Sequence, residues 1–168
     1  MAVQTIVTYP NPILKTNCPP VPQIDAGVLQ LLEDLVDTML AGPGSVGVAA
    51  PQIGVALRAC VVDVSKNRHG KDNHHGRLLM VNPEIVEKSG AAVMREGCMS
   101  VPDYTGDVER ATDITVRYTD PAGELQEFCA SGFEAVAIQH EMDHLDGMLF
   151  LDRISSLSTG LFRRKSYK

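Results

Sequence analysis

Apolar residues at helical spacing mark the first regular element of the chain. They are separated by three, one, three and four residues, as on one face of an α-helix: Val28, Leu31, Leu32, Leu35 and Met39. Asp25 stands just before this run and can cap the helix, and the Gly-Pro-Gly sequence at 42–44 ends it. The pattern predicts an N-terminal amphipathic helix.

A second helix is predicted over residues 132–146. Ser131 and Glu134 have the spacing of a capping box, and Gly147 is typical of a helix stop. Segments between the two helices that are rich in Val, Leu and Ile, or that alternate in polarity, predict strands at 57–64, 78–86, 113–119 and 125–129. We therefore expect an α+β fold in which short antiparallel strands pack around the second helix.

The other segments are expected to be irregular. Repeated prolines remove backbone donors from residues 1–24, which predicts an extended N-terminal arm. Residues 46–54 have the composition of a loop of small residues, and 66–77 that of a solvated, histidine-rich loop. Residues 154–168 are expected to be a short basic tail with a frayed end, so that 1–168 forms a single catalytic domain.

Composition narrows the possible functions. The formal net charge is −6 and there is no Trp, which argues against direct nucleic-acid recognition and against an anionic membrane surface. No apolar run approaches the roughly 20 residues of a membrane span. The N-terminus lacks the pattern of a secretory signal, and the four cysteines are scattered, as is typical of reduced thiols. We expect a cytoplasmic protein.

The sequence His-Glu-Met-Asp-His at 140–144 is the strongest chemical signal. On a helix, His140 and His144 lie one turn apart on one face, as two ligands of a single metal ion require. Glu141 lies beside the first ligand and can act as a general base without binding the metal. Phe133, Val136 and Ala137 extend the same face, so the site should lie at the base of an apolar cavity, although plain core packing would give the same stripe. A chance match in a helix with two core histidines is the alternative.

A catalytic metal usually has a third protein ligand. Cys98 is the best candidate, because it follows a predicted strand and Gly97 permits close approach of the backbone. Cys60 and Cys129 are expected to be ordinary packed thiols, Cys18 belongs to the N-terminal arm, and the histidines of the 66–77 loop are expected to face solvent.

Three segments together resemble the peptide deformylase family: 45–52, 96–100 and 139–144. The opening Tyr-Pro-Asn-Pro-Ile-Leu at 9–14 is similar as well, and the likeness extends to about Arg153. The resemblance implies an α+β metalloenzyme that removes the formyl group from the N-terminal formylmethionine of nascent polypeptides. It implies one divalent ion, with Fe(II) as the native metal and Zn, Ni or Co able to replace it.

Site roles follow from the same resemblance. Cys98, His140 and His144 would bind the metal, Glu141 would be the general base, and the Gln52 side chain and the Met99 backbone N–H would stabilise the oxyanion. The peptide would pair with the backbone at Val46 and Gly47. Its methionine side chain would enter an apolar pocket whose expected walls are Val46, Met94, Phe133, Val136 and Ala137. Glu96 and Arg110 would support the site through a salt bridge between them or to Asp143.

This sequence departs from the family pattern at several positions, some of which are expected to lie near the substrate. Ser45 stands where glycine is usual, Val48 and Met99 replace leucines, and Thr105 stands where many bacterial relatives carry arginine. The 66–77 loop is longer than usual and the tail is short. Relatives with a long C-terminal helix suggest a transient contact with the ribosome, which stays a hypothesis for this chain.

Two other functions are compatible with the metal motif. The first is an endopeptidase of the His-Glu-x-x-His type, which would cleave internal peptide bonds. The second is a structural or sensing metal site without turnover, which predicts a closed sphere of four ligands and folding that depends on the metal.

Overall fold

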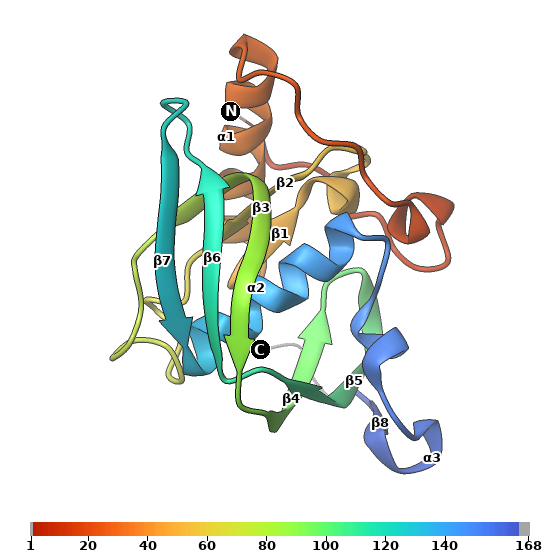
Figure 1. Ribbon diagram of the computed structural model, residues 1–168. Helices are drawn as coiled ribbons and strands as arrows, with labels where there is room; N and C mark the ends of the chain where they lie inside the picture. Colours follow the sequence, from red (N-terminus) through yellow and green to blue (C-terminus); the bar gives the residue numbers. More distant parts are fainter. Residues whose placement is uncertain (1, 165–168) are drawn as a thin grey trace.

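Two antiparallel sheets form the framework of the protein. The computed structural model describes residues 2–164 (Figure 1). In the larger sheet the strand order is β1 (Gly47–Ala49), β2 (Ala59–Val62), β3 (Leu78–Ser89), β6 (Asp113–Thr119), β7 (Leu125–Ser131). In the smaller sheet the order is β4 (Ala92–Cys98), β5 (Val101–Arg110), β8 (Leu161–Arg163).

Helices complete the fold around these sheets. The α-helices are α1 (Ala26–Ala41), α2 (Gly132–Leu145) and the single turn α3 (Leu157–Gly160). Short 3₁₀ helices lie at η1 (Pro12–Lys15), η2 (Ala50–Ile53) and η3 (Phe150–Arg153). No helix within residues 2–164 combines the length and the apolar character that a membrane crossing requires. The protein is therefore of mixed α and β structure, with few helices and antiparallel sheets.

Helix α2 lies against the larger sheet and next to the strands of the smaller one (Figure 1). Its buried residues Ala135, Ile138 and Leu145 share one apolar cluster with residues of β2, β3 and β6. Burial of this face removes apolar surface from water, which is the main stabilising term for such a helix. The consequence for the site is that α2 is held rigidly beside the end of β4.

Helix α1 covers another part of the larger sheet. Its N-cap Asp25 accepts a hydrogen bond from the Val28 N–H at 2.9 Å, and Gly42 forms the C-cap. The buried face of the helix packs into a cluster with Val48 and Val61 of β1 and β2. These contacts fix β1, which carries residues on the rim of the functional cavity.

The strands differ from the sequence-based expectation in length and number. β3 has 12 residues and β5 has 10, so the description of short strands is wrong for both. The segment 46–54 is not a simple loop, because it contains β1 and η2. Residues 161–163 form β8 on the edge of β5, so the frayed tail is wrong as far as Arg164; residues 165–168 lie outside the described part. β3 and β8 pair with β6 and β5, which are distant from them in sequence, and local periodicity does not reveal such partners.

The predicted capping box at the start of α2 is also wrong. Ser131 is the N-cap but makes no side-chain capping bond; its hydroxyl accepts from Asn73 Nδ2 at 2.9 Å. Glu134 is buried and accepts from the His75 backbone N–H at 2.6 Å, and it also bonds the His75 ring. The 66–77 loop is thus tied to the helix rather than being solvated throughout, and its His69 ring lies 5.7 Å from the ring of Phe133.

The cysteines are all free thiols, as expected. Cys18 and Cys60 are buried, whereas Cys129 is exposed, so the expectation of a packed thiol is wrong for Cys129. Cys129 lies on β7, which is an edge strand, on the face that points to solvent. The buried thiol of most interest is Cys98, the last residue of β4.

Candidate metal centre and active site

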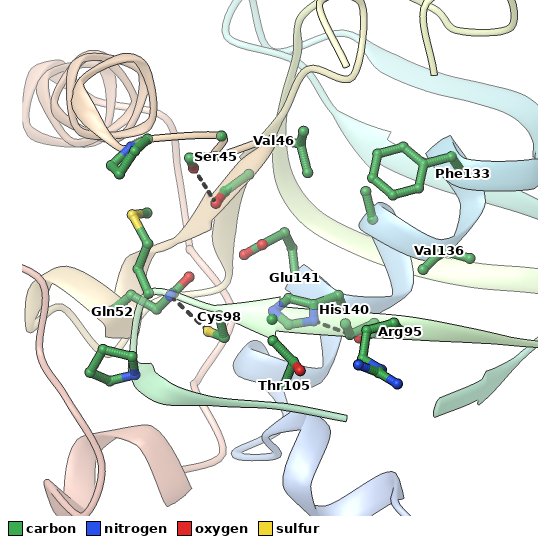
Figure 2. A pocket seen from close by; sticks show the side chains of 18 of the residues that line it. Ser45, Val46, Gln52, Arg95, Cys98, Thr105, Phe133, Val136, His140 and Glu141 are labelled. Carbon is green, nitrogen blue, oxygen red and sulfur yellow. Dashed lines mark hydrogen bonds and ion pairs between the residues drawn. The ribbon is translucent and has the colours of Figure 1, made fainter. Parts of the chain in front are cut away.

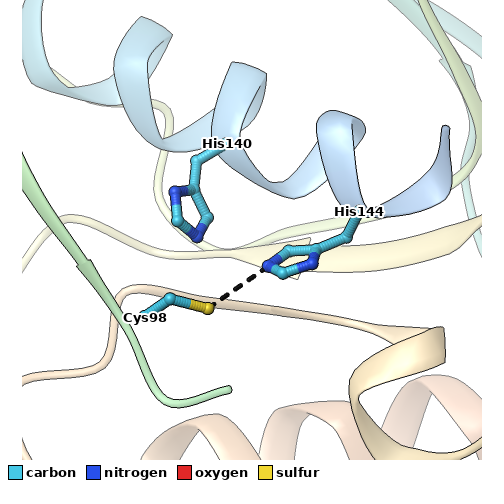
Figure 3. Close-up of side chains that lie close together, drawn as sticks. All are labelled: Cys98, His140 and His144. Carbon is cyan, nitrogen blue, oxygen red and sulfur yellow. Dashed lines mark hydrogen bonds between the residues drawn. The ribbon is translucent and has the colours of Figure 1, made fainter. Parts of the chain in front are cut away.

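Cys98, His140 and His144 converge although the cysteine is more than forty residues from the histidines in the sequence. One ligand atom from each of the three residues lies within 4.8 Å of the others. The Cys98 Sγ is 3.4 Å from His144 Nε2, and the two imidazoles project from successive turns of α2 toward the sulfur (Figure 3). Cys98 and His144 are buried, and His140 is only slightly exposed.

A buried network of charges holds His140. Its Nδ1 lies 2.8 Å from Glu96 Oε1, and Arg110 donates to both oxygens of Glu96 at 2.6 and 2.9 Å. Arg110 also donates to Asp143 at 2.8 Å, and Asp143 receives a further pair of bonds from Arg153. Burial acts to raise the pKa of Glu96, but bonds from His140 and Arg110 hold that pKa below its usual value. An ionised Glu96 can only accept, so His140 Nδ1 donates and Nε2 is left for the cluster.

His144 has a different electrostatic environment from His140. Burial and the proximity of His140 lower the pKa of His144 well below its usual value, which favours the neutral imidazole. Its Nδ1 is buried and has no hydrogen-bond partner within the described part of the chain. A thiol and two imidazoles that share one buried space form a donor set for a divalent transition metal ion, and the fit is therefore good.

Glu141 lies beside this cluster without being part of it. The side chain is buried, and burial raises its pKa to about 7, with nearby Glu96 and Asp143 adding to the rise. Its Oε2 has no hydrogen-bond partner among residues 2–164. A Cβ added at Gly47 would come within 2.9 Å of Glu141 Cγ and Oε1, so the glycine leaves room for the carboxyl. A carboxyl that titrates near neutrality can both take and return a proton.

Hydrogen bonds hold the side chain of Gln52 beside the Cys98 sulfur. Its Oε1 accepts from the Ala49 N–H at 3.0 Å, and its Nε2 donates to Ser100 Oγ at 3.1 Å and lies 3.4 Å from Cys98 Sγ. The amide donor is thus directed into the cluster. Met99 is the residue after Cys98, in the turn between β4 and β5, and it lines the same cavity.

A cavity of about 430 Å³ opens above the cluster. Figure 2 shows Phe133 and Val136 on α2 at one side and Ser45 and Val46 at another. Gly47 and Ala137 also line it, together with Gln52, Cys98, His140 and Glu141. Met94 does not: it lies four residues before Cys98 on β4, about 13 Å along an extended strand. The structure therefore brings together every residue expected at the site except Met94.

Several residues of the site escaped the sequence analysis. Arg153 and Ser100 make the bonds described above, and Arg95 and Arg164 line the cavity. From the sequence, Arg164 could be recognised only as part of a basic tail. Its position in the cavity depends on the pairing of β8 with β5. Ser100 lies in the segment 96–100 that carries the family resemblance, but no role was predicted for it. Arg153 carried no local pattern that could have marked it.

Metal-dependent hydrolases commonly combine such a buried donor set with a carboxyl beside it at the base of a cavity, and this is the class that the site indicates. The family model described as polypeptide deformylase matches residues 3–159, and the chain belongs to that family. Enzymes of this family remove the N-formyl group from nascent polypeptides.

Individual relatives are similar over nearly their full length. The peptide deformylase of Syntrophobacter fumaroxidans is 41% identical and covers 98% of this chain and 94% of its own. The crystal structure of the Ehrlichia chaffeensis peptide deformylase with actinonin has a TM-score of 0.87 at 35% identity, covering 94% of this chain and 92% of that one. The Met-Ala-Ser-bound Acinetobacter baumannii enzyme has a TM-score of 0.85 at 38% identity, with 91% and 99% covered.

Proposed function

We propose that this chain removes the formyl group from the N-terminal formylmethionine of new polypeptides, with Cys98, His140 and His144 as its metal ligands. The observation that carries the proposal is the convergence of these three ligand atoms within 4.8 Å, inside a cavity that also contains Glu141. Residues from Pro43 to Arg164 contribute to the cavity, which supports one catalytic domain.

The three ligands would hold one divalent ion, with a fourth position left for water or substrate. Such an ion would supply Lewis acidity, which activates water and polarises a carbonyl group. We propose Fe(II) as the native metal. A thiolate and two imidazoles also accept Zn, Ni or Co, since affinity alone does not select among these ions. An iron(II) enzyme is expected to lose activity when it is purified in air.

Glu141 is proposed to move the proton. It would accept a proton from the attacking water and return it to the departing amine as the formyl C–N bond breaks. Three features support this role: its burial, its pKa near 7 and an oxygen not engaged within the described part of the chain. A carboxyl with an ordinary pKa would be a weaker base, and at neutral pH it would hold almost no proton to donate.

The oxygen of the formyl group gains negative charge during attack, and donors that are already oriented stabilise it. We assign this role to the Gln52 side-chain amide and the backbone N–H of Met99. The bond from Ala49 N–H to Gln52 Oε1 fixes the amide and leaves its nitrogen directed into the cluster, which supports the assignment.

The peptide is proposed to lie along the backbone at Val46 and Gly47. Main-chain pairing of this kind reads little side-chain sequence, which suits an enzyme with many substrates. The methionine side chain would pack against Phe133, Val136 and Ala137, the apolar part of the cavity wall. Glu96, Arg110 and Asp143 would act through His140, by fixing its ring and its tautomer.

Formylated chains are made where translation occurs, so we place the enzyme in the cytoplasm, with transient contact to the ribosome as a further hypothesis. No partner other than the peptide N-terminus is needed for the chemistry. The α2 helix, with its two histidines, would be the central element of the fold in functional terms as well.

The test is formate release from formyl-Met-Ala-Ser by anaerobically prepared protein of known metal content. Wild-type protein should release formate, and Glu141→Gln should lose about 100-fold or more in kcat while it retains the metal. Cys98→Ser should lose metal and activity together. Cleavage of internal bonds in unformylated peptides would support an endopeptidase instead. Metal that stabilises the fold without any turnover would support a structural site.

A further inference from the structure

The turn between β4 and β5 contains a buried hydroxyl close to the Cys98 sulfur. Ser100 follows Met99 in this turn, and its side chain is fully buried. Cys98 and Val101 pair with each other on the two sides of the turn. Three consecutive residues at the end of the hairpin therefore carry a proposed metal ligand, a proposed oxyanion donor and a buried hydroxyl.

This hydroxyl and one backbone N–H together orient the amide of Gln52. The N–H of Ala49 can only donate, so the amide atom that it meets at 3.0 Å is the carbonyl Oε1. One N–H of the amide nitrogen Nε2 donates to Ser100 Oγ at 3.1 Å. Nε2 also lies 3.4 Å from Cys98 Sγ, which is a weaker acceptor (Figure 2). With Oε1 and one N–H held in this way, the second N–H is directed into the cluster.

The N-terminal arm ties together the two segments that carry this contact. The Val7 N–H donates to the Gln52 carbonyl at 2.7 Å, and the Tyr9 N–H donates to the Ser100 carbonyl at 2.8 Å. Gln52 belongs to η2 and Ser100 to the β4–β5 turn, which are 48 residues apart in the sequence. Because one short piece of chain binds both backbones, the hydroxyl is held within reach of the amide by main-chain bonds.

The burial of Gln52 makes the acceptor on Ser100 important. The side chain of Gln52 is 1% exposed, so bulk water would not replace a lost acceptor. Without the hydroxyl, the acceptor left to Nε2 among its present contacts is the Cys98 sulfur. An N–H that turned to the sulfur would no longer face the developing oxyanion. A donor that is oriented in advance needs no reorganisation in the transition state, which is the source of its catalytic effect.

We propose that Ser100 is a positioning residue for the oxyanion step. Its hydroxyl accepts one N–H of Gln52 and thereby directs the other N–H at the oxygen of the formyl group. Ser100 is not among the residues that line the cavity, so it acts through Gln52 and not on the substrate. The inference rests on the proposed function, and it adds a residue to which the sequence assigned no role.

The experiment is a double-mutant cycle on formate release from formyl-Met-Ala-Ser, with holoenzyme of measured metal content. Ser100→Ala should lower kcat about 10-fold, because one oxyanion donor loses its fixed orientation, while KM stays within about twofold. Gln52→Ala should lower kcat about 100-fold or more. Adding Ser100→Ala to Gln52→Ala should change kcat by no more than about twofold, since the partner of the hydroxyl is already absent.

The matched control removes a buried hydroxyl elsewhere in the protein. Thr38 lies on α1, accepts from the Gln4 N–H at 2.9 Å and is outside the cavity lining. Thr38→Val should leave kcat at the wild-type value. A purely structural role of Ser100 in the hairpin would instead lower kcat by the same factor with and without the Gln52 amide.

Hydrogen exchange of the side-chain amides, measured by NMR on zinc-loaded protein, gives a readout without turnover. The amide protons of Gln52 should exchange at least about 10-fold more slowly than those of Gln23, which is exposed. Ser100→Ala should speed the exchange of Gln52 and leave that of Gln23 unchanged. The comparison within wild type needs no substitution, so it tests the bond whether or not Ser100→Ala folds.

These outcomes distinguish the two proposals. The role of Ser100 is overturned by an equal loss of kcat in both backgrounds, by wild-type kcat in Ser100→Ala, or by exchange at Gln52 as fast as at Gln23. In each of these cases formate release by wild type still upholds the proposed function. Failure of wild type to release formate overturns the proposed function and the oxyanion role with it, whereas the exchange comparison still decides whether Ser100 holds the amide.

Discussion

The carboxylate of Glu96 accepts a hydrogen bond from Nδ1 of His140 at 2.8 Å, and this bond decides which ring nitrogen remains for a metal. Glu96 lies on β4 and His140 on α2, so the contact joins the smaller sheet to the helix. Arg110 binds the same carboxylate from β5 and keeps it ionised. The orientation of one ligand therefore depends on three separate elements.

Glu96→Gln should weaken metal binding about 10- to 100-fold, because partners of this kind fix the ligand ring and raise its basicity. The measurement is competition with a chromogenic chelator, using the folded protein. Glu84→Gln is the control, since Glu84 forms only an exposed ion pair with Arg117. Equal metal affinity in the two variants would contradict the role given to Glu96.

Arg110→Met should lower the free energy of unfolding by about 3–5 kcal/mol, because it leaves two buried carboxylates, Glu96 and Asp143, without their shared cation. Denaturant unfolding of the metal-free proteins isolates this effect from loss of metal. Arg117→Met removes two exposed pairs, with Glu84 and Glu127, and should cost less than about 1 kcal/mol. A similar loss in both variants would show that the buried network adds no more stability than these exposed pairs.

Gly47→Ala tests the close approach between β1 and the carboxyl of Glu141. The added methyl would displace Glu141, and a displacement near 1 Å can reduce turnover about 100-fold. Metal content should stay at the wild-type level, because the three atoms nearest to the added methyl belong to Glu141 and Val61 and not to a metal ligand. Steady-state kinetics with metal analysis provides the check, with Gly27→Ala on α1 as the control. Wild-type kcat in Gly47→Ala would mean that Glu141 adapts without loss.

His75→Ala tests the attachment of the 66–77 loop to α2. The variant removes the ring contact to Glu134 but keeps the backbone N–H bond to the same carboxylate. Amide hydrogen exchange in 66–77 should become about 10-fold faster, while the global unfolding transition changes little. Lys71→Ala, an exposed change in the same loop, is the control. Unchanged exchange in the loop would indicate that the backbone bond and the Asn73–Ser131 bond hold the loop without the His75 ring.

Local patterns predicted much of the framework. The capping residue Asp25 and the apolar face behind it gave the bounds of α1 closely, and the strands predicted at 113–119 and 125–129 correspond to β6 and β7. The helical span at 132–146 differs from α2 by one residue. Such features can be predicted from neighbouring residues, because caps, turns and periodic faces involve positions a few residues apart.

Long-range pairing was beyond these patterns. β8 joins the hairpin of β4 and β5 from more than fifty residues away, and periodicity did not show this pairing. The spacing of Ser131 and Glu134 predicted a capping box, but Glu134 binds His75 from a loop more than fifty residues away. The pairing of β8 and the contact of Glu134 with His75 both depend on which segments pack together in the folded chain.

The residues alone indicated the chemistry: a glutamate between two histidines one helical turn apart, a candidate thiol ligand, and a buried face beside them. How this chemistry is supported became visible in the folded chain. Folding placed Arg110 between two carboxylates and seated Arg164 beside Gly97 through a strand at the far end of the chain. The reason is that helical spacing fixes neighbours within one element, whereas contacts between strands follow from packing of the whole chain.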